Sequence, residues 1–324
     1  MVKIGFSYTF PTLRFLNEER APVGFDMRDF CEWIIQLKDT EDRPSMVVAL
    51  SNGNFADIEW RDCMYDFDKG LYSFRLKKLR SDNIPAFTGM NTDSTDIILE
   101  ENQFLGEFNL IVFDPHINRV IVQSNYFGLS IGQIELALSQ MRLTFLESSG
   151  IAFNRNDPGF VKLEFLVDNE SIASLENSDI YRSINLRVAD MPNLATTPIN
   201  SNTLHRVIEL GNELGGVSVN IQVSLSHEQK ERSLDETEVR ELIGDIRTLN
   251  ENREAKLSVK ARSDIESPLE NIDVLLPKLT SLVELNNTGR STLGMEYLYV
   301  QFKEQNYFNE EQHMQERARL LGPA

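Results

Sequence analysis

Apolar and polar residues follow two different periods along residues 109–146. Residues 109–113 and 120–123 are rich in β-branched and aliphatic side chains, and Asp114 and Pro115 lie between them. Because Pro115 presets one backbone angle and Asp114 can bond back to nearby amides, this pattern predicts a β-hairpin. From Ser130 onward, apolar residues recur at helical spacing, which predicts a helix over residues 130–146 with Ser130 as its N-cap. Residues 110–113 do not alternate, so we expect that strand to be covered on both faces.

The rest of the first half predicts further strands and one more helix. Residues 27–37 carry an apolar helical stripe. Residues 147–159 hold two glycines, one proline and several turn-forming residues, which is typical of a linker. We therefore expect an N-terminal α+β domain at residues 1–146, with the hairpin and helix as its core. The runs that predict its other strands are 2–10, 46–50, 55–67 and 71–80.

Strands alternate with helices in the second half of the chain, which predicts a C-terminal α+β domain at residues 160–324 with a helical tail. Residues 269–285 are also helical in pattern, although Pro277 should bend or restart that helix. We expect the fold class α+β, with two domains that each pack helices on one face of a mixed or mainly antiparallel sheet. The predicted strands are 161–167, 184–188, 217–225 and 256–262, and the predicted helices are 204–214, 233–249 and parts of 293–320.

In the predicted strands of the second half, apolar and polar residues alternate. Because successive side chains of a strand point to opposite faces of the sheet, these strands form one apolar face and one polar face. The helices should cover the apolar face, which leaves an open polar surface with a row of cations. Such a surface suits a phosphate backbone or an acidic partner, and it lacks the exposed aromatic side chains that stack single-stranded bases. A plain solvated sheet face is the alternative. The cations of this predicted row are Lys162, Arg187, Lys256, Lys260 and Arg262.

A second basic run lies in the first half, with Arg75, Lys77, Lys78 and Arg80 within six residues. This run is a second candidate for contact with nucleic acid or a partner. It is equally typical of an edge strand that charge protects against pairing with another sheet.

Composition limits the classes of function. The net charge of −18 over 324 residues argues against attraction of the whole surface to nucleic acid or anionic membrane, but it leaves room for a local basic strip. No apolar run approaches the roughly 20 residues of a membrane span, and no signal peptide is evident at the start. We therefore expect a cytoplasmic protein. Cys31 and Cys63 lack zinc-ligand spacing, and we predict no catalytic residue, no metal site and no cofactor.

One short motif keeps an enzyme among the alternatives. Glu254-Ala255-Lys256 matches the (D/E)xK pattern that restriction-type nucleases carry on a strand. A nuclease also needs an upstream acidic residue to share a divalent cation, whereas Asp245 lies on a predicted helix. Elsewhere, Tyr126 and Phe127 lie where a strand meets a helix and are candidates for contact with a partner.

The predicted hairpin carries a family resemblance. The segment Glu101-Asn102-Gln103-Phe104-Leu105-Gly106, then FNLIVFDPHINRVIVQSNYFGLS and an amphipathic helix, resembles the RexA-like phage-exclusion proteins of bacteria and prophages. The second half is similar in outline through VKLEFLVD, INLRVADM, ELIGDIRTLN, AKLSVKARSD and NIDVLLPKL. The resemblance implies a non-enzymatic cytosolic sensor of phage infection that forms a homo-oligomer such as a dimer. It also implies contact with DNA or a phage product, and a signal to a membrane effector encoded nearby.

Three hypotheses follow. The first is a sensor or adaptor in anti-phage defence. The second is a metal-dependent nuclease that uses Glu254 and Lys256, and the third is an assembly subunit whose acidic surface binds a basic protein.

Overall fold

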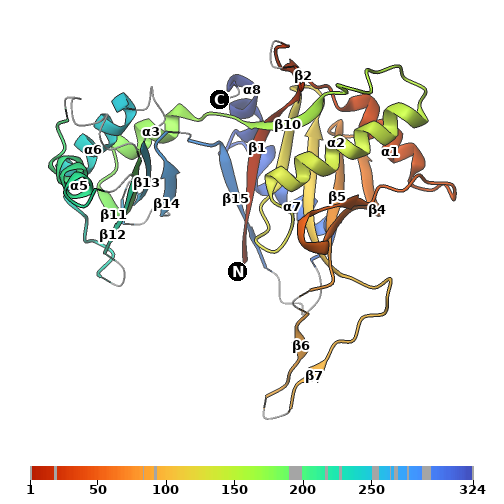
Figure 1. Ribbon diagram of the computed structural model, residues 1–324, viewed down its shortest axis with the longest axis horizontal. Coiled ribbons are helices and arrows are strands. Elements are labelled where there is room, and N and C mark those ends of the chain that lie inside the picture. The colour runs from red at the N-terminus through yellow and green to blue at the C-terminus, as the bar shows by residue number, and fades with distance from the viewer. Residues whose placement is uncertain are drawn as a thin grey trace. The chain divides into compact units, whose positions relative to one another are not determined.

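The protein has an α+β fold, seen here in a computed structural model (Figure 1). The chain divides into two compact units, Met1–Leu166 with Leu279–Ala324, and Val167–Lys278. The structure describes residues 2–322 apart from 18–19, 83, 91–92, 190–198, 216–217, 226–227, 250–254, 263, 266–268, 276 and 287–292.

A large antiparallel sheet forms the frame of the first unit, in the order β10-β1-β9-β8-β5-β4-β3. The long strand β1 organises it, because one edge pairs first with β15 and then with β10, and the other with β9 and then with β2. The strands are β1 (Val2–Arg14), β2 (Val23–Gly24), β3 (Val48–Ala49), β4 (Phe55–Asp66), β5 (Leu71–Arg80), β8 (Leu105–Asp114), β9 (Arg119–Gln123), β10 (Phe160–Phe165) and β15 (Thr280–Leu285). A 3-10 turn, η1 (Ser51–Gly53), joins β3 to β4.

Helices cover both faces of this sheet, where we expected them on one. Helices α1 (Arg28–Leu37) and α2 (Ile131–Ser148) pack on one face, and Figure 1 shows α2 lying across the strands. The helices α7 (Met295–Phe302) and α8 (Met314–Leu320), with the π-helical turn η3 (Lys303–Tyr307) between them, pack on the other. Strand β8 therefore buries alternate residues in two different cores. This confirms the prediction that residues 110–113 are covered on both sides.

The units divide the chain differently from the expected domains. Residues 147–159 connect α2 to β10 within the first unit, because β10 pairs with β1. The prediction of a helix over residues 269–285 was wrong: β14 (Glu270–Asp273) and β15 replace it. In β15, buried Ser281, Val283 and Leu285 alternate with exposed residues, so its period is two rather than that of a helix.

The second unit has a smaller antiparallel sheet in the order β12-β11-β13-β14. One face of this sheet packs against the helices and forms a separate apolar core, as the sequence predicted for the second half. Its other strands are β11 (Ile180–Ala189), β12 (Ser218–Ser224) and β13 (Ala255–Arg262), and its helices are α3 (Asn169–Glu176), α5 (Asn202–Glu213) and α6 (Glu236–Leu249).

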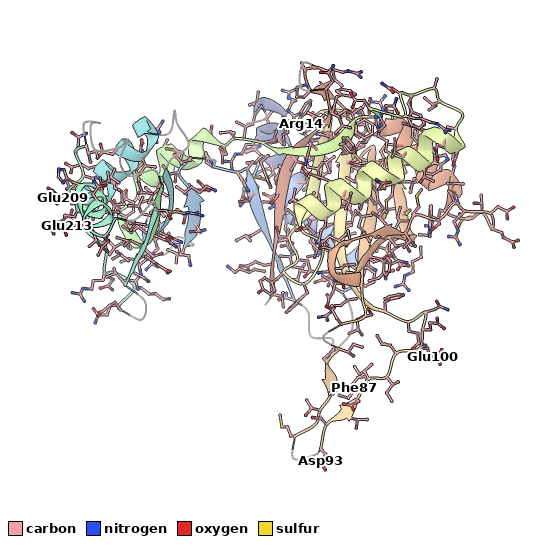
Figure 2. All side chains as sticks on the ribbon, viewed as in Figure 1. Arg14, Phe87, Asp93, Glu100, Glu209 and Glu213 are labelled. Carbon is pink, nitrogen blue, oxygen red and sulfur yellow. The ribbon has the colours of Figure 1, made fainter. Side chains whose placement is uncertain are left out.

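Two further strands form a hairpin arm between β5 and β8. Strands β6 (Ala86–Phe87) and β7 (Thr95–Asp96) pair with each other and, among the described residues, with no other strand. Figure 2 labels Phe87, Asp93 and Glu100 on this arm. In the described part of the chain, no helix combines the length and apolarity needed to cross a bilayer.

Candidate functional site

The polar face of the second unit's sheet brings three cations together. Arg187 on β11 lies opposite Lys256 on β13, and Lys260 lies four residues further along β13, opposite Ser183. All three side chains are exposed. Within the described residues, no ion-pair partner lies within 4.0 Å of any of them. We call Arg187, Lys256 and Lys260 the basic face.

The neighbours of the basic face are mostly uncharged hydrogen-bonding groups. Asn185 lies opposite Ser258 on one side and Gln222 on the other, and Arg187 lies opposite Asn220. Asp273 on β14, opposite Ser258, carries a carboxylate on this face. Its Oδ1 accepts a hydrogen bond from the backbone N–H of Leu275 at 3.1 Å. Lysine, arginine and amide side chains in this arrangement can all donate to phosphate oxygens.

The other two predicted cations make interactions of their own. Lys162 lies on β10 in the first unit, where its Nζ is 2.8 Å from Oε2 of Glu135. Arg262 lies on β13, but its guanidinium donates to the carbonyl oxygens of Ile265 and Lys230. Three of the five predicted residues therefore form the basic face.

Arg182, which no sequence pattern singled out, binds backbone carbonyl oxygens of the same segment as Arg262. Its guanidinium donates to the carbonyl oxygens of Gln229, Arg232 and Glu228 at 2.6 to 2.9 Å. The two arginines together hold the chain around residues 228–232 beside the sheet. Arg182 lies at a β-bulge between Tyr181 and Ser183. No pattern in the sequence indicates this bulge.

The second basic run lies on β5, in the interior of the large sheet between β4 and β8. The prediction of an edge strand was therefore wrong. Arg75 is buried against Asp62, and its Nη1 donates to the carbonyl oxygen of Leu293 at 3.0 Å.

Carboxylates of the neighbouring strands face the other charges of this run. Lys77 Nζ is 3.0 Å from Asp57 Oδ2, and Arg80 lies 3.9 Å from Glu107 Oε1. Lys78 is half-buried. Arg75, Lys77 and Arg80 thus link β5 to carboxylates of its neighbouring strands within the sheet.

The structure describes only some of the residues of the nuclease hypothesis. Glu254 lies outside the described residues. Asp245 on α6 is buried, and its Oδ2 accepts hydrogen bonds from the backbone N–H groups of Asn200 and Ser201, at 2.8 and 2.6 Å. That carboxylate therefore fixes the start of α5. Among the described residues, no group of three or more His, Cys, Asp or Glu is placed to hold a metal ion.

Fold and face together define an antiparallel α+β protein with an exposed cationic sheet surface. The chain belongs to a family of unknown function, DUF6731, whose model matches residues 25–317. No curated protein matches the chain.

Proposed function

We propose that this protein is a non-enzymatic sensor or adaptor that binds the phosphate backbone of nucleic acid through the basic face. The observation that carries the proposal is the cluster of Arg187, Lys256 and Lys260, exposed and without a described carboxylate partner. The chain has a net charge of −18. Three cations on one sheet face, with no ion-pair partner among the described residues, therefore form a local basic patch on an acidic protein.

The spacing of the cluster supports contact with a backbone. Neighbouring strands lie about 4.8 Å apart and residues rise about 3.3 Å along a strand, so Lys256 and Lys260 are about 13 Å apart. Duplex DNA carries one charge per roughly 1.7 Å of its axis, so such a span faces several phosphates. The face offers no aromatic side chain for stacking among its described residues. Binding should therefore be insensitive to base sequence.

The cellular role is part of the same proposal. The resemblance of the hairpin and helix to RexA-like phage-exclusion proteins supports a place in anti-phage defence, with nucleic acid or a phage product as the trigger. It also supports a cytoplasmic location and a signal to a membrane effector encoded nearby.

Fluorescence anisotropy with a labelled DNA duplex at several salt concentrations tests the binding. Three phosphate contacts predict a slope of log K against log[salt] of about −2.7, and Lys260→Glu should flatten the slope by about 0.9 or more. The matched control is Arg206→Glu on α5, an exposed cation on a helix away from this face. It should leave affinity nearly unchanged.

Two outcomes would reject the contact between the basic face and phosphate, and a third would reject its independence of base sequence. A slope near zero for the wild type, or equal losses in Lys260→Glu and Arg206→Glu, would mean that the basic face makes no phosphate contact. Duplexes of unrelated sequence should bind alike, and a strong preference among them would contradict a backbone-only contact.

A further inference from the structure

Strand β10 lies at one end of the strand order of the large sheet, and α2 seals the outer edge of this strand. The backbone N–H groups of Leu163 and Val161 on β10 donate to Glu135 Oε1 and Ser139 Oγ of α2, both at 2.9 Å. These side chains satisfy the amides that β10 turns away from β1. Covering an edge in this way prevents the pairing of another strand.

The opposite edge is open. Strand β3 pairs with β4 and, in the described part of the chain, with no other strand. A cavity of about 330 Å³ lies between β3 and α2. We call this the edge groove, and its lining is uncharged: Ser45, Met46, Val47, Val48, Ala49, Leu136, Gln140, Met141 and Thr144. Val47 and Leu136 are also substantially exposed. An uncharged groove beside a strand edge that pairs with no described strand is an arrangement in which proteins accept an extended peptide.

The hairpin arm has short strands and exposes apolar side chains. Its two-residue strands β6 and β7 pair with each other, and a two-stranded hairpin is marginally stable in water without a further strand or an apolar surface. Phe87, Met90 and Ile98 on the arm are exposed to 70%, 97% and 87%. Three large apolar side chains exposed on one short hairpin suit an interaction surface.

We propose that the arm of a second copy of this chain docks in the edge groove and adds a strand to β3. The uncharged lining of the groove matches the apolar side chains that the arm exposes. Because each chain carries both an arm and a groove, two copies related by a twofold axis make the contact twice. The proposal concerns the first unit and is independent of nucleic-acid binding by the basic face.

Sedimentation velocity of the full chain over a range of concentrations measures the contact. We expect a dimer that dissociates at least tenfold more readily in Phe87→Asp and in Leu136→Asp. Matched controls change residues elsewhere that are at least as exposed: Phe67→Asp, with Phe67 88% exposed against 70% for Phe87, and Leu210→Asp, with Leu210 45% exposed against 41% for Leu136. Both controls should remain dimeric, as should Lys260→Glu, which tests only the basic face.

A labelled synthetic peptide of residues 84–99 gives a second measurement. It should bind the Phe87→Asp protein, whose groove is intact, and it should not bind Leu136→Asp. A dimer that survives both variants would place the interface elsewhere and overturn the proposal. A wild-type chain that is monomeric at every concentration would also overturn it. In that case, binding of the peptide would mean that the groove takes the arm of its own chain.

Discussion

Gly128 packs against the side chain of Asn109 so closely that a β-carbon on Gly128 would lie 2.4 Å from Asn109 Oδ1. The same Oδ1 accepts a hydrogen bond from the backbone N–H of Leu129 at 2.7 Å, and Asn109 Nδ2 donates to the carbonyl oxygen of Gln123 at 3.0 Å. Asn109 thereby fixes the step from β9 to α2. The loop held in this way presents Tyr126 and Phe127 to solvent.

Replacing Gly128 with alanine should destabilise the first unit by about 1–3 kcal/mol, because the added methyl group must displace a buried, hydrogen-bonded side chain. Gly132→Ala on α2 is the matched control, since nothing lies within 4 Å of a β-carbon there. It should be neutral or stabilise by about 0.5–1 kcal/mol. Urea unfolding of both variants checks the pair. Equal stabilities would show that Asn109 moves aside without cost.

The hairpin and helix were predictable because their determinants are local. Ser130 caps α2 as expected, with Gln133 completing a capping box. The polar face of the second unit was predictable for a similar reason, since period two sorts Arg187, Lys256 and Lys260 to one side of their strands.

Pairing between distant strands was not predictable. Lys162 alternates on its strand just as Lys260 does, yet β10 joins β1 in the first unit and β13 joins β11 in the second. The basic run on β5 resembled an edge because its counter-charges, Asp57 and Asp62 on β4 and Glu107 on β8, come from other segments. A pattern read along one segment carries no information about these partners.

Arg75 should therefore matter for stability rather than for binding. Arg75→Gln removes the closer of the two ion-pair partners of Asp62 and the hydrogen bond to Leu293, so we expect a loss of about 2–4 kcal/mol. The measurement is the urea midpoint together with the affinity for duplex DNA at a temperature where the variant is folded. A folded variant with weakened DNA binding would return this run to the candidate site.

Glu135 should show what sealing a sheet edge contributes. Glu135→Ala removes the acceptor for the Leu163 N–H and the ion pair with Lys162, and leaving a buried donor unsatisfied costs about 1–3 kcal/mol. Glu135→Gln keeps an acceptor oxygen and should recover most of the loss. Thermal melting separates the two variants, and hydrogen exchange at Leu163 should accelerate only in Glu135→Ala. If both variants melt together, the hydrogen bond to β10 contributes nothing measurable.

Asp66 should make the packing of the C-terminal helices depend on pH. Burial alone would raise the pKa of this carboxyl, but hydrogen bonds from Lys303, Tyr299 and the backbone N–H of Lys69 together hold the pKa below its ordinary value of 3.8. A depressed pKa in the folded state means that the carboxylate stabilises the protein above pH 3.8 and that this contribution is lost as the pH falls through the folded-state pKa.

Asp66→Asn should therefore melt at a lower temperature than the wild type near pH 7. The difference should shrink as the pH falls below about 4. Asp68→Asn, at an exposed position of the same turn, is the control and should track the wild type throughout. A gap between wild type and Asp66→Asn that stays constant down to pH 2.5 would show that the carboxylate charge is not what holds α7 and the π-helical turn to β4.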